Sequence, residues 1–230
     1  MKILLWDFDG TLGYREGGAW TASLLETVRR LAPDRPVTLG QLQPYTREGF
    51  PWHTPERPHL DLDTPDAWWG ALTPVFVRAY RGVGFESIEA ETLARQVRET
   101  YLDPTRWRRS EGAMEVLAAL RAGGWQHAML SNHVPELGVL LDHLDLARYF
   151  VRVFNSAEIG YEKPNPAVFE VVKAAFPESA VRWMIGDSFR ADIQGAADVG
   201  IPGILVHRED PKAQVFCESL RDVRDYLMRE

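Results

Sequence analysis

The chain has 230 residues, a formal net charge of −7 at pH 7 and 45% hydrophobic residues. This length fits one large domain or two small ones, and the apolar content is enough for a substantial core. The moderately acidic balance excludes nucleic acid and an anionic membrane as expected partners, although a locally positive site for a phosphorylated ligand is compatible with it.

The sequence predicts a cytoplasmic protein. The apolar run that starts the chain is interrupted by Asp7 and Asp9 before a secretory signal develops, and no apolar stretch is long enough to cross a bilayer. Cys217 is the only cysteine, so no internal disulfide can form, which fits a reducing compartment. We expect Cys217 to lie in a helical tail and to have no catalytic role.

The first predicted element is a buried strand over residues 3–6, followed directly by Asp7-Phe8-Asp9-Gly10-Thr11. Side chains two apart on a strand share a face, so Asp7 and Asp9 are expected to point the same way, and Gly10 permits a sharp turn. Two carboxylates beside a hydroxyl at a strand end suit a nucleophile, an acid/base and a cation site. The pentapeptide alone could also be an ordinary polar turn.

Residues 14–106 are predicted to form a helical domain inserted after the first strand. Apolar residues recur at helical spacing over residues 19–31, 65–80 and 87–101. The stretch 44–65 is rich in proline and aromatic residues and is expected to be irregular loop. We see no strand-like alternation in this segment.

Residues 107–230, together with residues 1–13, are predicted to form the core domain. Short apolar runs predict further strands at 125–130, 150–154, 181–185 and 204–206. Amphipathic stretches predict helices at 113–122, 135–144, 166–175 and 191–199, and a last helix over 215–228. Such alternation predicts an α/β fold with a Rossmann-like parallel sheet covered by helices.

Polar clusters follow four of the predicted strands. After the aspartate pentapeptide come Ser131-Asn132, Lys163-Pro164 and Gly186-Asp187-Ser188, with Asp192 five residues after Asp187. In open α/β sheets ligands bind beyond the carboxyl ends of the strands, so the four clusters are expected to meet. Singly they could be a turn, a solvated lysine and helix caps; jointly these alternatives are poor.

The ordered set Asp-x-Asp-Gly-Thr, Ser-Asn, Lys-Pro and Gly-Asp-x4-Asp resembles the haloacid dehalogenase (HAD) superfamily of hydrolases, in the phosphatase-type group with a helical cap after the first core strand. The resemblance spans essentially the whole chain. It implies a Mg²⁺-dependent phosphatase that hydrolyses a small phosphorylated metabolite through an aspartyl-phosphate.

The resemblance also implies a role for each motif residue. Asp7 would be the nucleophile and Asp9 the general acid/base, while Lys163 would supply positive charge to the phosphoryl group. Mg²⁺ would be bound by the Asp7 carboxylate, the Asp9 backbone carbonyl and Asp187. The remaining implied roles are phosphoryl binding by Thr11, Ser131, Asn132 and Lys163, and support of Lys163 or a metal-bound water by Asp192.

Two features narrow the implied reaction. An aspartate at the second acidic position points to phosphoryl transfer and not to carbon–halogen cleavage. Residues 14–105 contain no lysine, which argues against phosphonate cleavage through a Schiff base. A phosphosugar mutase and a non-catalytic phospho-ligand-binding module remain alternatives, whereas Asp9 and the large cap disfavour a receiver domain. The sequence Leu12-Gly13-Tyr14-Arg15 departs from the family pattern, which puts substrate access in doubt.

The cap offers candidate substrate contacts, although a small helical domain also needs aromatic residues for its own core. The candidates are Tyr45, Arg47, Trp52, His53, Arg57, His59, Trp68 and Trp69. Arg106, Arg108 and Arg109 flank Trp107 and are interpreted as a solvated hinge face. Both a monomer and a homodimer are compatible with the sequence.

Overall fold

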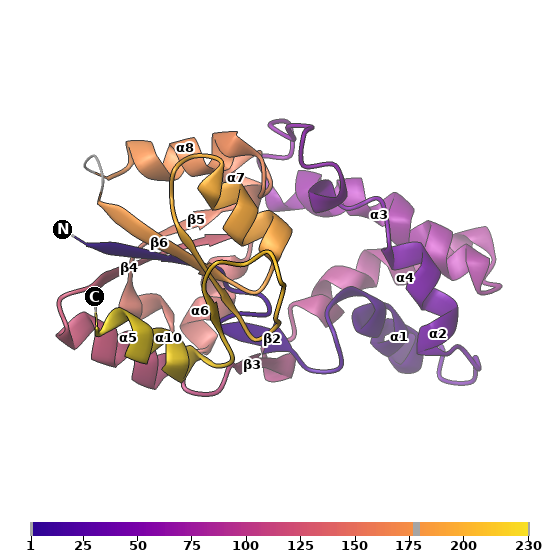
Figure 1. Cartoon of the computed structure of the whole chain (residues 1–230). Helices are drawn as coiled ribbons and strands as arrows, with labels where there is room; N and C mark the ends of the chain where they lie inside the picture. The colour runs from indigo at the N-terminus through magenta and orange to yellow at the C-terminus, as the bar shows by residue number, and fades with distance from the viewer. Residues whose placement is uncertain (1, 177–179, 230) are drawn as a thin grey trace.

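The computed structural model describes residues 2–176 and 180–229. Figure 1 shows two parts side by side: a parallel sheet flanked by helices, and a group of helices that projects beyond one end of that sheet. The projecting helices all belong to the chain between residues 16 and 106, and we call this part the cap. The sheet with its flanking helices is called the core.

The core contains a six-stranded sheet in the order β5-β4-β1-β6-β7-β8, in which all neighbouring strands are parallel. Leu5 in the middle of the sheet is paired with Ala128 on one side and Met184 on the other. The α/β, Rossmann-like fold with an insertion after the first strand is therefore confirmed. The strands are β1 (Ile3–Trp6), β4 (Gln126–Ser131), β5 (Phe150–Asn155), β6 (Val181–Gly186), β7 (Gly203–Val206) and β8 (Phe216–Cys217).

Alternate side chains of the central strand enter two separate hydrophobic clusters. Leu4 and Trp6 belong to the first cluster, and Ile3 and Leu5 belong to the second. Because strand side chains alternate between faces, the two clusters occupy opposite faces of the sheet. Helices on the first face are α5 (Ala113–Ala122), α6 (Leu137–His143) and α10 (Leu220–Leu227). Helices on the second face are α8 (Pro166–Ala174) and α9 (Gly195–Ala197), and the short α7 (Ser156–Ile159) follows β5.

The cap is helical, as predicted. Its longest helix begins at Pro65, which suits the first turn because proline has no N–H to satisfy, and the Thr64 hydroxyl accepts a hydrogen bond from the N–H of Ala67. The stretch between the first and third helices is mainly irregular. The helices are α1 (Trp20–Leu31), α2 (Leu39–Leu42), α3 (Pro65–Gly82) and α4 (Ser87–Tyr101), with short 3₁₀ turns η1 (Gln43–Thr46) and η2 (Pro51–His53).

A small antiparallel ribbon joins the cap to the core, and it was not predicted. It consists of β2 (Gly13–Arg15) and β3 (Trp107–Arg109), in which Tyr14 is paired with Arg108. Each strand has three residues, too few for an alternating pattern to be recognised. The short turn η3 (Pro104–Arg106) precedes β3. Trp107 is buried, while Arg108 and Arg109 are exposed, as expected of a solvated hinge face.

The prediction of one helix over residues 215–228 is wrong in its first part. Phe216 and Cys217 form the edge strand β8 beside β7, and the helix starts at Leu220, where the Ser219 hydroxyl accepts from the N–H of Asp222. The predicted helix at 191–199 begins earlier, as the π-helical turn η5 (Phe189–Gln194), and continues into α9. The turn η4 (Ala147–Tyr149) leads into β5. None of the helices in the described ranges is both long and apolar enough to span a bilayer.

Candidate active site

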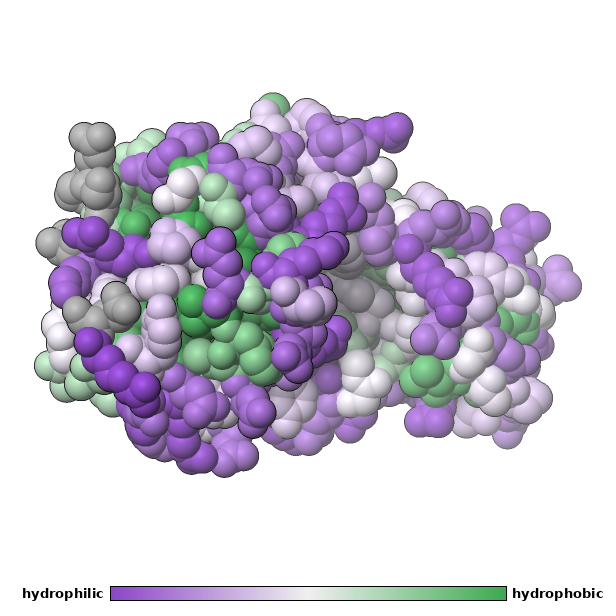
Figure 2. Space-filling view, in the orientation of Figure 1, coloured by the Kyte–Doolittle hydropathy of each residue, from purple (hydrophilic) through white to green (hydrophobic). Residues whose placement is uncertain are grey.

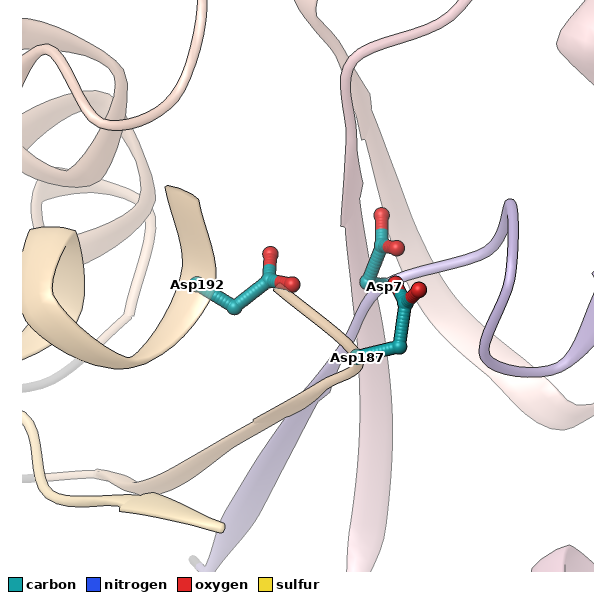
Figure 3. A group of neighbouring side chains, drawn as sticks. All are labelled: Asp7, Asp187 and Asp192. Atoms are coloured by element: carbon teal, nitrogen blue, oxygen red, sulfur yellow. The ribbon is translucent and has the colours of Figure 1, made fainter. Parts of the chain in front are cut away.

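The predicted site residues meet at the carboxyl ends of the central strands. Asp7 follows β1, Asp187 follows β6, and Asp192 lies on η5; Figure 3 shows the Asp192 carboxylate directed toward the other two. The N–H of Asp7 donates to the carbonyl of Ile185 at 2.9 Å, which continues the pairing of β1 with β6 up to the site. The site thus lies where parallel strands of an open sheet expose their ends.

The Asp7 carboxylate is held by three donors. Its Oδ1 accepts from Ser131 Oγ at 3.0 Å and from Lys163 Nζ at 2.8 Å, and its Oδ2 accepts from Thr11 Oγ1 at 3.4 Å. The side chain is buried, so these contacts fix its orientation in place of water. Thr11 and Ser131, predicted to bind phosphoryl oxygens, contact Asp7; a phosphoryl-binding role for their hydroxyls stays a prediction.

Lys163 uses all three of its ammonium protons. They are donated to Asp7 Oδ1 at 2.8 Å, to the carbonyl of Leu130 at 2.9 Å and to Asp192 Oδ1 at 2.6 Å. Burial by itself would lower the pKa of Lys163, but the negative charges of Asp192 and Asp7 raise the pKa above its ordinary value. Lys163 is therefore a fixed positive charge between the carboxylates of Asp7 and Asp192.

Two further side chains hold Lys163 in position. The Lys163 N–H donates to Asn132 Oδ1 at 2.7 Å, and Asn132 Nδ2 donates to the Lys163 carbonyl at 2.9 Å. Asp192 accepts from Lys163 with Oδ1 and from the Ser188 N–H with Oδ2, at 3.0 Å. Burial raises the pKa of Asp192, and the Lys163 charge opposes this effect. Asp192 thus contacts the Lys163 ammonium directly, and its role in orienting Lys163 stays a prediction.

The carboxylates crowd together and resist full ionisation. Burial, followed by the charges of Asp7 and Asp187, raises the pKa of Asp9 to about 7. Burial and the charge of Asp7 also raise the pKa of Asp187. The backbone is close-packed here, since a Cβ on Gly10, whose φ is +86°, would lie 2.6 Å from Asp187 Oδ2.

A divalent cation would relieve this repulsion. Carboxylate oxygens of Asp7, Asp187 and Asp192 all lie within 4.8 Å of one another. Asp192 is buried, and its two oxygens accept from Lys163 and from the Ser188 N–H, whereas Asp187 is half-buried and is the more open of the two to a cation. A donor set made only of oxygen suits a hard cation such as Mg²⁺.

The carboxylates open into a cavity of about 390 Å³. The surface is hollowed between core and cap in Figure 2. Its core wall includes Asp7, Asp9, Lys163 and Asp187, and its cap wall is aromatic. The cap residues that line it are Trp20, Trp52 and Tyr101, and the further core residues are Asn132, His133, Pro164, Ser188, Arg190, Ala191 and Asp192.

Of the cap candidates named from the sequence, Trp52 alone lines this cavity. Trp69 donates its indole N–H to Glu136, and Trp68 is fully buried in the cap. The sequence did not predict that Trp20 and Tyr101 line the cavity. The available signal was their position close to the two points where the chain crosses between core and cap, one at the start of α1 and the other at the end of α4.

His59 instead joins the cap to the loop that carries Lys163. His59 Nε2 lies 3.1 Å from Glu162 Oε1, and the His59 N–H donates to the Gly160 carbonyl at 2.9 Å. Asn165 Nδ2 adds a bond to the Pro55 carbonyl at 2.9 Å. His59 and Glu162 are both buried, so the pair anchors the cap loop on the core.

The fold and the site together define an α/β protein whose strand-end carboxylates are covered by a helical cap. The model of the haloacid dehalogenase-like hydrolase family matches residues 1–200. The chain belongs to this family. It is 31% identical over 227 residues to haloacid dehalogenase-like hydrolase domain-containing protein 3 of Mus musculus, covering 96% of this chain and 87% of that protein.

Two further relatives illustrate the range of similarity. The phosphoserine phosphatase of Thermus thermophilus is 34% identical over 180 residues, or 74% of this chain and 69% of that protein. The crystal structure of a putative HAD-hydrolase from Bacillus subtilis bound to magnesium has a TM-score of 0.73 at 19% identity and covers 98% of both chains. The structural likeness supports the fold of core and cap.

Proposed function

We propose that this protein is a Mg²⁺-dependent phosphatase that hydrolyses a phosphomonoester of a small metabolite through a phosphorylated Asp7. The observation that carries the proposal is the arrangement of Asp7, Asp9 and Lys163 in one cavity, with Lys163 Nζ 2.8 Å from Asp7 Oδ1. The phosphoserine phosphatase among the similar proteins supports the same reaction, and the magnesium in the Bacillus subtilis structure supports the choice of cation.

In this proposal Asp7 attacks the phosphorus atom. The P–O bond to the alcohol breaks as the bond to the Asp7 carboxylate forms, and water then cleaves the aspartyl-phosphate. The hydrogen bonds from Ser131, Thr11 and Lys163 hold the carboxylate in a single orientation before substrate arrives. Such preorganisation removes reorientation from the reaction step.

Asp9 acts as the general acid and then as the general base. A pKa raised to about 7 keeps a proton on a substantial fraction of Asp9 molecules near neutral pH. That proton passes to the leaving alkoxide, and the Asp9 carboxylate then accepts a proton from the attacking water. One group serves both steps because the first step leaves it in the form that the second requires.

Mg²⁺ would be held by Asp7, Asp187 and the backbone carbonyl of Asp9, and when bound it would neutralise phosphoryl charge. The crowding of carboxylates with raised pKa values is the feature of this chain that fits a bound cation. Lys163 adds a positive charge to the same side of the phosphoryl group, and Asn132 and Asp192 hold that charge in place.

The experiment is hydrolysis of p-nitrophenyl phosphate by the purified protein with and without Mg²⁺. We expect turnover only with Mg²⁺, and no turnover by Asp7→Asn. Full activity of Asp7→Asn would overturn the mechanism. A phosphosugar mutase would instead need a bisphosphate activator and release little phosphate, and a phospho-ligand-binding module would bind metal and phosphate without turnover.

We also propose the domain boundaries, the location and the partner of this enzyme. The cap domain comprises residues 14–106, and the core domain comprises residues 1–13 and 107–230; the β2–β3 ribbon at both crossing points supports these boundaries. The enzyme is cytoplasmic, in keeping with its one buried, free cysteine. Its partner is a small metabolite, and it acts as a monomer or a homodimer.

A further inference from the structure

The cavity has two chemically different walls. The wall from the core carries the carboxylates and Lys163, whereas the wall from the cap consists of Trp20, Trp52 and Tyr101. In the proposed reaction the phosphoryl group lies on the core wall. The alcohol part of the substrate must therefore lie against the three aromatic rings.

These rings are held by one another and by further aromatic residues of the cap. Trp20 stacks on Tyr101 with ring centroids 4.3 Å apart and an interplanar angle of 22°, and its centroid lies 5.5 Å from that of Trp52. Phe50 and Phe76 pack against the same indole at 4.7 Å and 6.0 Å. A wall whose rotamers are already fixed loses little conformational entropy when a ligand stacks on it.

The cap wall offers no charge to a substrate. The cap residues Arg47, Arg57 and His59, which could have bound an anionic group, do not line the cavity. On the core wall, all three Lys163 protons are already donated within the protein. Arg190 is the other cation in the lining, and its side chain is exposed, where an ion pair is screened by water.

Resting on the proposed function, we infer that the preferred substrates are phosphomonoesters of an uncharged alcohol that carries a flat ring, and that Trp20 and Trp52 are the residues that select them. The ring packs against the parts of the two half-buried indoles that remain exposed, which offer it an apolar aromatic surface. An alcohol that carries a carboxylate, as in phosphoglycolate or phosphoserine, would place its charge against an aromatic wall and lose hydration without gaining an ion pair.

The test compares three esters of primary alcohols under Mg²⁺: benzyl phosphate with a ring, ethyl phosphate with neither ring nor charge, and phosphoglycolate with a carboxylate. We expect kcat/KM for benzyl phosphate to exceed that for ethyl phosphate by about tenfold or more, as stacking energies predict. We expect phosphoglycolate to be no better than ethyl phosphate. Equal values for benzyl and ethyl phosphate, or a preference for phosphoglycolate that Arg190→Gln removes, would overturn the inference.

Variants test whether the aromatic wall from the cap causes the preference for benzyl phosphate. Trp52→Leu should bring kcat/KM for benzyl phosphate down to about the value for ethyl phosphate. The change should come mainly from a higher KM for benzyl phosphate. Trp183→Leu is the matched control, because Trp183 is also half-buried but packs on Tyr226 in the core, away from the cavity. A ratio that is unchanged in Trp52→Leu would overturn the inference. If Trp52→Leu does not fold, the three-ester comparison in the unmodified protein decides. Hydrolysis of p-nitrophenyl phosphate but of none of the three esters would also overturn the inference, whereas failure to hydrolyse p-nitrophenyl phosphate as well would refute the proposed function.

Discussion

The side-chain amide of Asn132 binds both backbone polar groups of Lys163, accepting from its N–H at 2.7 Å and donating to its carbonyl at 2.9 Å. Asn132 follows β4, whereas Lys163 lies in the loop after β5 and α7. The amide therefore fixes the distance between two strand ends and sets the point from which the Lys163 side chain reaches Asp7.

We expect Asn132→Ala to lower kcat by on the order of 10²-fold, since a misplaced catalytic group costs about that much. In this variant Lys163 would keep its charge, but its backbone would no longer be held by the side chain of residue 132. Steady-state kinetics with p-nitrophenyl phosphate measures the effect, and thermal unfolding shows whether the fold is retained. Gln126→Ala, which truncates an exposed amide at the start of the same strand, is the control. A variant that retains full kcat would contradict a positioning role for Asn132.

Metal binding should be visible without substrate. A ligand present at 100 times its Kd stabilises the folded state by about 2.7 kcal/mol, so the unfolding midpoint should rise with Mg²⁺ concentration. Asp187→Asn should abolish this rise and should also raise the midpoint in the absence of Mg²⁺, because it relieves repulsion with Asp7 and Asp9. Asp142→Asn removes an exposed carboxylate and should behave like the unmodified protein. An Mg²⁺ response that persists in Asp187→Asn would exclude Asp187 as a ligand.

His127 should make stability depend on pH. Its Nδ1 accepts from the indole N–H of Trp6 at 3.0 Å and its Nε2 lies 2.9 Å from the Leu117 carbonyl, a pattern that suits the neutral ring. Burial lowers the pKa of His127 from 6.5 to about 4, so the unfolded chain takes up the proton first as the pH falls. The free energy of unfolding should therefore be highest above pH 6.5 and decrease between pH 6.5 and pH 4, by roughly 3 kcal/mol for this group.

Chemical denaturation at pH 7 and pH 4.5 tests this dependence. His127→Gln has no proton to gain in that range, so the decrease should be smaller in this variant than in the unmodified protein. Other groups contribute equally to both proteins, and the difference between the two slopes isolates His127. Identical slopes would show that His127 titrates alike in the folded and unfolded states.

The buried pair His59 and Glu162 should show strong coupling. His59→Leu leaves Glu162 Oε1 buried without its hydrogen-bond partner, and this should cost about 1–3 kcal/mol. Glu162→Leu in addition removes the unpaired buried polar group, so the double variant should be more stable than His59→Leu alone. A double-mutant cycle by denaturant unfolding measures the coupling. Additive losses would mean that the two side chains act independently.

The sequence was most informative where a pattern was long or chemically distinctive. The apolar run before Asp7 and the polar clusters at residues 131, 163 and 187 predicted both the parallel sheet and the place where its strand ends meet. The β2–β3 ribbon was not predicted, because three residues carry no period and Arg108 and Arg109 look like surface loop. Cys217 was misplaced because β8 exists only through its pairing with β7.

The cap wall was the least predictable part of the site. Trp20 and Tyr101 belong to helices that were predicted correctly, but the turn of a helix that faces a cavity depends on how that helix packs. Aromatic residues are equally suited to the cap interior, as Trp68 shows. Trp20, Trp52 and Tyr101 differ from the other aromatic residues of the cap in lining the cavity, which depends on packing and not on residue type.

Amino-acid changes on the two faces of the sheet should affect the cavity to different degrees. The cluster that contains Leu4 and Trp6 continues through Phe8 and Trp107 to the cap and reaches the rings around the cavity, whereas the cluster with Ile3 and Leu5 ends at α8 and α9. Amino-acid changes on the first face should therefore alter the shape of the cavity between core and cap without contacting it. In directed evolution toward a new substrate, useful remote mutations should therefore be more frequent on the face covered by α5, α6 and α10 than on the face covered by α8 and α9.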